Sequence, residues 1–281
     1  MQQKRILVTG ANGYLGRHVV RALLELKQEV LACDLAFDAV DSRAHQINES
    51  IFSGAADIYR RVGSPDVCLH LAWRDGFLHN SPAHMGDLSA HYTFLLHMLD
   101  GGLPHIAAMG SMHEVGYWEG VIDEHTPTQP LSMYGIAKNS LRQALALMAQ
   151  AHEAVYQWLR GYYILGDDLH NHSIFSRITQ LESEGASTFP FTTGKNKFDF
   201  IYIDELAKQI ACTICQEEVT GIINCCSGKP VSLAEQVEQF LSEHHFSIRP
   251  EYGAYPDRPY DSPGMWGDPT KIQTILTLFK K

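Results

Sequence analysis

The feature that most constrains the fold of this chain is a glycine-rich segment over 9–16, between an apolar run and an amphipathic stretch. Residues 5–9 have the pattern of a strand, and apolar residues recur at helical spacing over 13–29. Gly10 would permit a tight turn, Gly13 a close approach to a pyrophosphate, and Gly16 close packing of helix on sheet. The segment therefore predicts a strand–turn–helix unit that binds a dinucleotide.

An acidic residue at the end of the next strand indicates which dinucleotide would bind. Asp34 closes an apolar run over 29–34. A carboxylate there can accept hydrogen bonds from both ribose hydroxyls of NAD, and it would repel the 2′-phosphate of NADP. Because no Arg or Lys follows before Arg43, the sequence favours NAD(H) over NADP(H). The alternative is a structural turn followed by an incidental aspartate.

Strand-like and helix-like segments alternate through the first half of the chain. Strands are expected over 5–9, 29–34, 67–71, 105–109 and 154–165, and helices over 13–29, 83–99 and 131–151. This alternation is typical of a mostly parallel sheet with helices on both faces. After residue 166 the pattern is weaker. It predicts helices over 173–183, 204–216 with Asp204 as N-cap, and 233–244, strands over 198–203 and 222–224, and a loop over 250–269.

Three polar residues in the middle of the chain indicate proton-transfer chemistry. Tyr134 and Lys138 are four residues apart on an expected helix, so their side chains share one face. A nearby ammonium and a positive nicotinamide ring would lower the pKa of the phenol. Ser111 follows an expected strand, where ligands of open α/β sheets bind, and its hydroxyl can bond a carbonyl or alcohol oxygen.

The charge and the apolar pattern exclude some classes of function. The 281 residues include 22 Lys and Arg against 32 Asp and Glu, a formal net charge of −10. A net-acidic chain is not typical of nucleic-acid binders, and no apolar run reaches the roughly 18 residues of a membrane span. The N-terminus lacks a signal-peptide segment. We therefore expect a cytoplasmic protein with neither nucleic-acid nor membrane partners.

Cysteine and histidine raise the question of a metal site. A C-x-x-C pair occurs at Cys212 and Cys215, and Cys225 and Cys226 are neighbours. The first pair falls on an amphipathic segment, and no second pair or His-x-His completes a four-ligand set. We expect packed thiols, histidines with surface or interface roles, and no metal.

Taken together, these motifs resemble the extended short-chain dehydrogenase/reductase family, in its NAD-dependent epimerase/dehydratase branch for nucleotide sugars. The resemblance covers nearly the whole chain and also rests on the stretches 66–72, 159–166, 198–207 and 223–228. It implies an α/β fold, a Rossmann-type doubly wound parallel sheet with a smaller α/β C-terminal substrate domain. The cofactor domain would span 1–165, with 198–226 returning to it, and the substrate domain 166–197 and 227–281.

The resemblance also implies roles for single residues. Tyr134 would be the acid/base, Lys138 its support and ribose anchor, and Ser111 a ligand of the reacting oxygen. The expected cofactor-binding residues are Gly10, Asn12, Gly13, Tyr14, Leu15, Gly16, Asp34, Leu71, Ala72, Tyr134 and Lys138. The expected substrate-binding residues are Ser111, His113, Tyr163, Arg177 and Arg258, the two arginines because a pyrophosphate needs cations.

Departures from the family pattern narrow the chemistry. Met112 and His113 stand where the family's dehydratases carry an Asp–Glu pair, so water elimination lacks its acid and base. Glu114 would replace one of them only if the register slipped. Tyr163 stands where the family has a substrate-binding Asn, and the chain is short for a 4-epimerase of this branch.

We therefore expect an NAD(H)-dependent oxidoreductase that reduces the C4 ketone of a nucleotide-activated 4-keto-6-deoxy sugar. Its partner would be a nucleoside-diphosphate sugar, and the resemblance implies a homodimer formed through the helices 83–99 and 131–151. Two alternatives stay open: a 4-epimerase with tightly bound NAD, and a non-catalytic protein that binds the dinucleotide.

Overall fold

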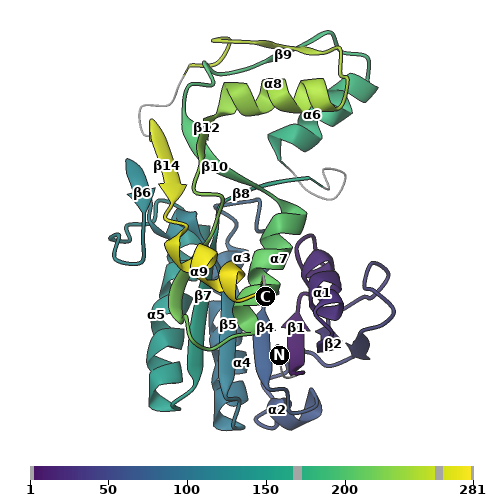
Figure 1. The fold of residues 1–281 in the computed structure, drawn as a ribbon, viewed down its shortest axis with the longest axis vertical. Helices are drawn as coiled ribbons and strands as arrows, with labels where there is room; N and C mark the ends of the chain where they lie inside the picture. Colours follow the sequence, from purple (N-terminus) through teal and green to yellow (C-terminus); the bar gives the residue numbers. More distant parts are fainter. Residues whose placement is uncertain (1–2, 167–172, 257–261, 280–281) are drawn as a thin grey trace.

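A parallel sheet forms the centre of the computed structural model, which describes residues 3–166, 173–256 and 262–279. Seven strands of the described chain lie in the order β11-β7-β5-β4-β1-β2-β3 (Figure 1). Their bounds are β1 (Arg5–Thr9), β2 (Glu29–Cys33), β3 (His45–Ile47), β4 (Val67–His70), β5 (His105–Ser111), β7 (Val155–Gly161) and β11 (Gly221–Cys225). The strand order reverses between β1 and β4, the place where open α/β sheets bind ligands.

Helices cover both faces of this sheet because alternate strand residues point to opposite sides. Ile6 and Val8 face a cluster shared with α1 (Gly16–Glu25), α7 (Ile203–Ile214) and α9 (Thr270–Leu278). Leu7 faces a second cluster, shared with α2 (Ile58–Arg61), α4 (Leu88–Asp100) and α5 (Met133–Ala151). The short α3 (Ala83–Gly86) contacts α4 and α5. The doubly wound architecture confirms the predicted fold class.

A second, smaller body lies beyond the carboxyl ends of the main sheet, at the top of Figure 1. One sheet has the order β12-β10-β14-β6 with β8 added to β10, and β13 pairs with β9. Its strands are β6 (Gly120–Ile122), β8 (Tyr163–Leu165), β9 (Thr188–Pro190), β10 (Lys197–Tyr202), β12 (Pro230–Ser232), β13 (Arg249–Glu251) and β14 (Gly264–Gly267). Helices α6 (Ile174–Ser183) and α8 (Leu233–Glu243) cover its phenylalanine-rich core.

Four local expectations are wrong. The strand expected over 154–165 is divided into β7 and β8, which belong to different sheets. The helix expected over 83–99 is divided into α3 and α4 at Asp87, which caps both. Tyr202, not Asp204, is the N-cap of α7, and Asp204 lies in the first turn, where a carboxylate suits the helix dipole. The loop expected over 250–269 contains β14, a strand that forms by parallel pairing with β6 and β10. Its four residues include two glycines, so they carry little strand signal.

The 198–226 segment divides between the two bodies. Helix α7 packs on α1, and β11 is an edge strand of the main sheet beside β7. Strand β10 belongs instead to the second sheet. Near the C-terminus, α9 packs on α7 and β11, so the chain returns to the main sheet after β14.

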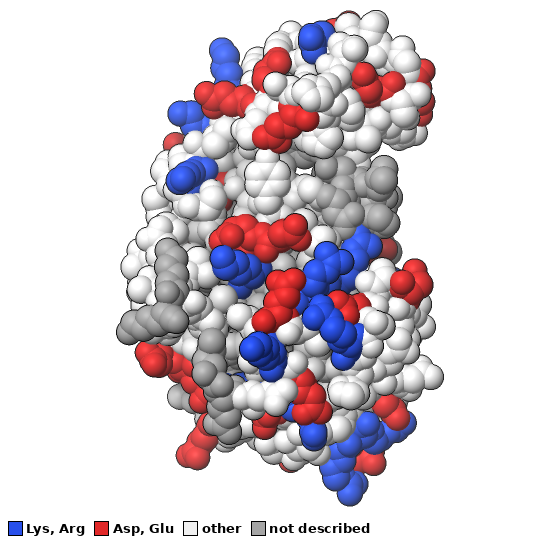
Figure 2. Space-filling model, turned by 45° about the vertical axis from the view of Figure 1, so that its right-hand side comes forward, with Lys and Arg blue, Asp and Glu red and all other residues white. Residues whose placement is uncertain are grey.

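Acidic and basic side chains are interspersed over much of the face in Figure 2. Ion pairs join several elements of the fold, including Arg5 with Glu29 and Lys4 with Glu217. In the part of the chain that the structure describes, no helix is both long enough and apolar enough to pass through a bilayer.

Candidate active site

A cleft of about 1070 Å³ opens at the carboxyl ends of β1, β4 and β5, where the strand order reverses. The predicted site residues that line it are Gly10, Gly13, Tyr14, Leu15, Gly16, Asp34, Leu71, Ala72, Ser111, His113, Tyr134 and Tyr163. Asn12 and Lys138 are not among the lining residues. Asn12 N donates a hydrogen bond to Asp34, and Lys138 is only 3% exposed. Residues from distant parts of the sequence thus meet at one edge of the sheet.

The turn between β1 and α1 has the close backbone packing that only glycine permits. Gly10 has a φ of +70°, and a Cβ atom there would lie 2.7 Å from the Cα atom of Ala72. A Cβ atom on Gly16 would collide with the Gly10 carbonyl oxygen. The first turn of α1 carries no acidic residue, so its N–H groups present an unopposed partial positive charge. This cradle fits the pyrophosphate of a dinucleotide.

Asp34 is fixed by backbone donors on both carboxylate oxygens. Its Oδ2 accepts a hydrogen bond from Asn12 N at 2.8 Å, and its Oδ1 accepts one from Leu35 N at 2.7 Å. A carboxylate has about four acceptor positions, so lone pairs remain for ribose hydroxyls. Arg43 pairs with Asp41 at 2.7 Å and is thereby engaged elsewhere. These residues fit NAD better than NADP.

Tyr134 lies in the first turn of α5, whose start is fixed at two points. The Ser132 hydroxyl accepts a hydrogen bond from Gly135 N, and Tyr134 N donates to the His79 carbonyl at 2.9 Å. Burial raises the pKa of the Tyr134 phenol, Glu114 raises it further, and a hydrogen bond with Ser111 opposes them. In the protein alone the pKa of Tyr134 is therefore raised, opposite to the expected direction.

Lys138 follows one turn later on α5, and its ammonium contacts the Met109 carbonyl and the Trp73 ring. Its Nζ donates a hydrogen bond to the Met109 carbonyl at 2.8 Å and lies 3.7 Å from the centre of the Trp73 ring. The distance from Nζ to the centre of the Tyr134 ring is 5.8 Å. Burial lowers the pKa of Lys138 to about 7, against the opposing effect of Glu114. The charge of this lysine is therefore adjustable near neutral pH.

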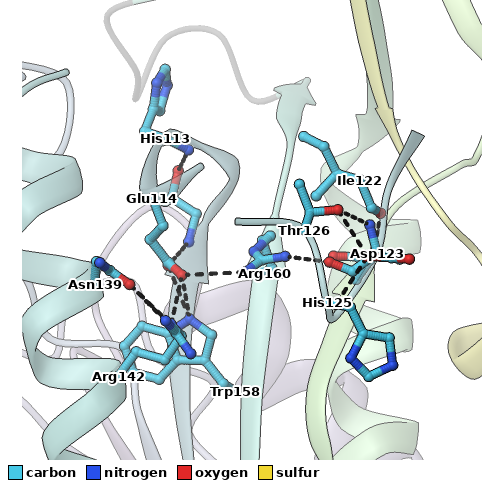
Figure 3. A network of polar contacts seen from close by, with 12 residues as sticks. His113, Glu114, Ile122, Asp123, His125, Thr126, Asn139, Arg142, Trp158 and Arg160 are labelled. Carbon is cyan, nitrogen blue, oxygen red and sulfur yellow. Dashed lines mark hydrogen bonds and ion pairs between the residues drawn. The ribbon is translucent and has the colours of Figure 1, made fainter. Parts of the chain in front are cut away.

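Ser111 is held by a reciprocal hydrogen-bonded turn at the end of β5. Its Oγ accepts from His113 N at 3.3 Å, and its own N donates to Glu114 Oε1 at 2.6 Å. The fully buried Glu114 carboxylate also accepts from Trp158 Nε1 at 2.9 Å (Figure 3). Arg142 lies 3.6 Å from it. Glu114 is thus engaged in fixing the serine turn and is not one of the residues lining the cleft.

Aromatic residues line the side of the cleft that faces the second sheet. The Tyr163 ring lies 4.6 Å from the Phe198 ring and 5.6 Å from the Phe200 ring, centre to centre. His113 is 6.4 Å from Tyr163 and 4.3 Å from His79. Burial lowers the pKa of His113 to about 4, with His79 adding to the effect. At neutral pH His113 is therefore an uncharged hydrogen-bonding group.

Of the two arginines expected to bind a pyrophosphate, only Arg177 is among the described residues, and it does not line the cleft. Arg177 is exposed on α6 and donates to Gln180 Oε1 at 2.9 Å. Arg258 lies outside the described residues, as does part of the loop that carries it. Arg74 is a cation that does line the cleft, and Asp87 holds it with two hydrogen bonds.

Sequence reasoning missed a cluster of aromatic rings around Tyr134. Trp73, His79 and His84 all have ring centres within 6.2 Å of the Tyr134 ring. Trp73 and His79 lie in the segment between β4 and α3, which has no periodic pattern to indicate its direction. The available signal was position alone, because Trp73 follows His70, Leu71 and Ala72 at the carboxyl end of β4.

The fold and this site define the class of protein. A model of the NAD dependent epimerase/dehydratase family matches residues 6–226, and the chain belongs to that family. It is 43% identical to a dTDP-6-deoxy-L-talose 4-dehydrogenase (NAD(+)) of Aggregatibacter actinomycetemcomitans, over 93% of this chain and 98% of that protein.

Two solved structures show how widely the fold is shared. A UDP-N-acetylglucosamine 4-epimerase from Methanobrevibacter ruminantium M1 matches with a TM-score of 0.84 and 20% identity, over 98% of this chain and 92% of that one. A UDP-glucose 4-epimerase from Thermus thermophilus, in complex with NAD, gives 0.80 and 18%, over 96% and 92%. At this identity the likeness establishes the fold alone.

The described residues contain no group of three or more His, Cys, Asp or Glu placed to hold a metal ion. All six cysteines are buried, and burial raises the pKa of Cys212 to about 11 and that of Cys225 to about 12. They are packed thiols, and none of them is paired in a disulfide.

Proposed function

We propose that this protein is an NAD(H)-dependent oxidoreductase that interconverts an alcohol and a ketone at C4 of a dTDP-linked 6-deoxy sugar. In the reducing direction its substrate is the 4-keto-6-deoxy sugar nucleotide. One observation carries the proposal: Ser111 and Tyr134 line a cleft built on a dinucleotide-type turn, with Lys138 directly behind. The 43% identity to a dTDP-6-deoxy-L-talose 4-dehydrogenase supports the choice of sugar and nucleotide.

The chain's own residues supply the acid and the hydrogen bonds of this reaction. Bound NADH would provide the hydride that reduces C4, and NAD⁺ would accept it in the reverse direction. Tyr134 donates its phenol proton to the C4 oxygen, and Ser111 donates a hydrogen bond to the same oxygen. Because burial raises the pKa of Tyr134, the phenol is protonated at neutral pH and ready to act as the acid. The nearby Lys138 ammonium stabilises the phenolate that remains.

The groups beside Ser111 support simple redox chemistry rather than water elimination. Met112 is apolar, and His113 is neutral at pH 7 because burial lowers its pKa to about 4. Glu114 is engaged by Ser111 N and by Trp158 Nε1. Elimination needs both a proton acceptor and a proton donor beside the sugar, and these three residues do not provide the pair.

The aromatic lining supports a 6-deoxy sugar as the bound group, because such a sugar carries a methyl group at C6. Tyr163, Phe198 and Phe200 form a continuous ring surface on one side of the cleft. Apolar surface gains most from the burial of a methyl group and offers nothing to a charged substituent.

In the test, purified protein is mixed with NADH and a dTDP-4-keto-6-deoxy sugar that a dehydratase makes in situ. NADH oxidation is followed by its absorbance. We expect NADH oxidation that depends on the sugar nucleotide, with UDP-linked sugars reacting more slowly. Absence of oxidation with every 4-keto sugar nucleotide would contradict the proposal. The reverse assay, with NAD⁺ and the 6-deoxy sugar nucleotide, gives the same answer independently.

Two other functions would give different results in the same tests. A 4-epimerase would release stoichiometric nicotinamide on denaturation and would need no added NADH. A protein that binds the dinucleotide without catalysis would bind NADH tightly while no sugar nucleotide reacts. The structural likeness to epimerases does not favour the first, because it extends to the fold only.

We also propose the domain bounds, the location and the oligomeric state of the protein. Residues 1–165 form most of the cofactor domain, to which α7, β11 and α9 return. Residues 166–197 and 227–267 form most of the substrate domain, together with β6 and β10. The expected bounds, 198–226 for the returning segment and 227–281 for the substrate domain, are therefore changed at β10 and α9. The protein acts in the cytoplasm as a homodimer formed through α4 and α5. Exposed apolar side chains on these helices support this pairing, including Tyr92 at 39% exposure and Leu147 at 69%. Replacing Leu147 with Lys should convert the dimer to a monomer in size-exclusion chromatography.

A further inference from the structure

Trp73 contacts both members of the Tyr134–Lys138 pair, although neither composition nor spacing singles it out. Its ring centre lies 3.7 Å from Lys138 Nζ and 6.2 Å from the Tyr134 ring, which it meets edge to face at 82°. A cation over an indole face is stabilised by the ring quadrupole, most strongly in a desolvated site. Lys138 is 3% exposed, so this site is desolvated.

The indole is itself held in place from two directions. Its Nε1 donates a hydrogen bond to His84 Nδ1 at 3.0 Å, and His84 Nε2 lies 2.9 Å from the Leu78 carbonyl. An indole nitrogen can only donate, so Nδ1 of His84 carries no proton and Nε2 donates to Leu78. His91 stacks on the indole with ring centres 4.4 Å apart and an interplanar angle of 14°. The ring plane that faces Lys138 is therefore fixed.

Trp73 stabilises the ammonium together with the Met109 carbonyl and the Glu114 carboxylate. His70 and His91 share a hydrogen bond of 2.8 Å, and burial lowers both their pKa values, that of His91 to about 3. They are neutral at pH 7 and add no second positive charge. Glu114 attracts the ammonium, and the phenol of Tyr134 stays protonated. The Met109 carbonyl is the acceptor of its hydrogen bond.

We propose that Trp73 is a positioning residue that keeps Lys138 charged and fixed beside Tyr134, by presenting an immobilised indole face to the ammonium. This inference rests on the proposed function for its catalytic consequence. The contact itself concerns the protein alone, so it can be tested without turnover.

The first experiment measures the ionisation of Lys138 by NMR of protein labelled at the lysine ε-carbons. The Lys138→Met variant identifies the signal by its loss. In wild-type protein we expect a titration midpoint near 7. In Trp73→Leu the midpoint should fall by about half to one pH unit. Leucine keeps Lys138 buried, but it has no aromatic ring to stabilise the ammonium. Trp73→Phe keeps an aromatic face and should shift less, in the same direction.

The second experiment measures kcat/KM for the sugar nucleotide against pH. The alkaline limb that follows Lys138 should move to lower pH in Trp73→Leu and move back in Trp73→Phe. The matched control is Trp118→Leu, since Trp118 bonds the Val121 carbonyl and is not one of the cleft-lining residues. Its Lys138 midpoint and its pH profile should equal those of wild type.

Coincident Lys138 midpoints in wild type, Trp73→Leu and Trp73→Phe would overturn the proposal. If Trp73→Leu does not fold, Trp73→Phe and wild type decide the matter by the same comparison. A failed proposed function gives a different result: no turnover in any variant, with the shift in midpoint still present.

Discussion

The cofactor side of the cleft and the sugar side are built on different principles. On the cofactor side, polar backbone groups and one carboxylate are fixed by short hydrogen bonds, as Asp34 is by Asn12 N and Leu35 N. On the sugar side, rings such as Tyr163 and Phe198 pack against one another. The first arrangement imposes the hydrogen-bond geometry of one cofactor, NAD, which stays the same whichever sugar is bound. The second imposes shape, which can change from one sugar to another without altering the fold.

The residue between the two sides should have the largest effect on turnover. Replacing Tyr134 with Phe removes the proton donor and keeps the ring, so kcat should fall by about 10²-fold or more. The dissociation constant for NADH, measured by fluorescence titration, should stay within a few fold because the glycine turn and Asp34 are untouched. Unchanged turnover would show that Tyr134 is not the proton donor and that the reacting group between the two sides is another residue.

A substitution of Asp34 tests the cofactor side alone. Asp34→Ala removes hydrogen bonds from a charged acceptor, each worth about 1.5–3 kcal/mol, so the Kd for NADH should rise at least tenfold. Preference for NADH over NADPH should decline together with it, because the repulsive carboxylate is gone. The KM for the sugar at saturating NADH should not change. Equal effects on both ligands would show that the two sides are not separable.

A substitution of Tyr163 tests the sugar side alone. Tyr163→Asn removes an aromatic ring that packs on Phe198, and aromatic pairs contribute about 0.5–1.5 kcal/mol beyond their buried area. We expect the KM for the sugar nucleotide to rise about fivefold, with the Kd for NADH unchanged. An unaltered sugar KM would contradict the assignment of the aromatic wall to sugar binding.

The smallest expected effect is on stability. Acid should lower the free energy of unfolding at each of two buried histidines. The folded-state pKa is about 3 for His91 and about 4 for His113, against 6.5 for an unperturbed histidine. As pH falls below about 6.5 the unfolded chain binds protons that the folded chain does not, so stability is lost. Between pH 7.5 and 5.5, each group should lower the free energy of unfolding by about 1.4 kcal/mol.

Denaturant unfolding at the two pH values measures this loss. In the variants His91→Gln and His113→Gln, the loss of unfolding free energy between the two pH values should be smaller by the contribution of the replaced histidine. A loss that neither variant reduces would show that these imidazoles are already charged in the folded protein.

The same contrast explains what the sequence could predict. The strand over 5–9, the glycine turn and Asp34 are local in sequence, and their spacing alone indicates their geometry. Strand β14 forms only because β6, more than 140 residues earlier, lies beside it. Charge alone predicts a pyrophosphate contact at Arg177, but this residue is exposed on α6 and is not among those that line the cleft. Trp73 was missed because its partners come from three separate elements.

The pairing of β14 with β6 and β10 has a consequence for synthesis of the protein. Met265 lies beside Gly120 on one side and Phe198 on the other, so a late segment joins two earlier ones. The N-terminal part of a chain generally folds first as it leaves the ribosome. The glycine turn can therefore assemble on the nascent chain, whereas the second sheet is incomplete until translation has passed residue 267. A ribosome stalled before that point would display a chain whose strands β6 and β10 still lack the strand that joins them.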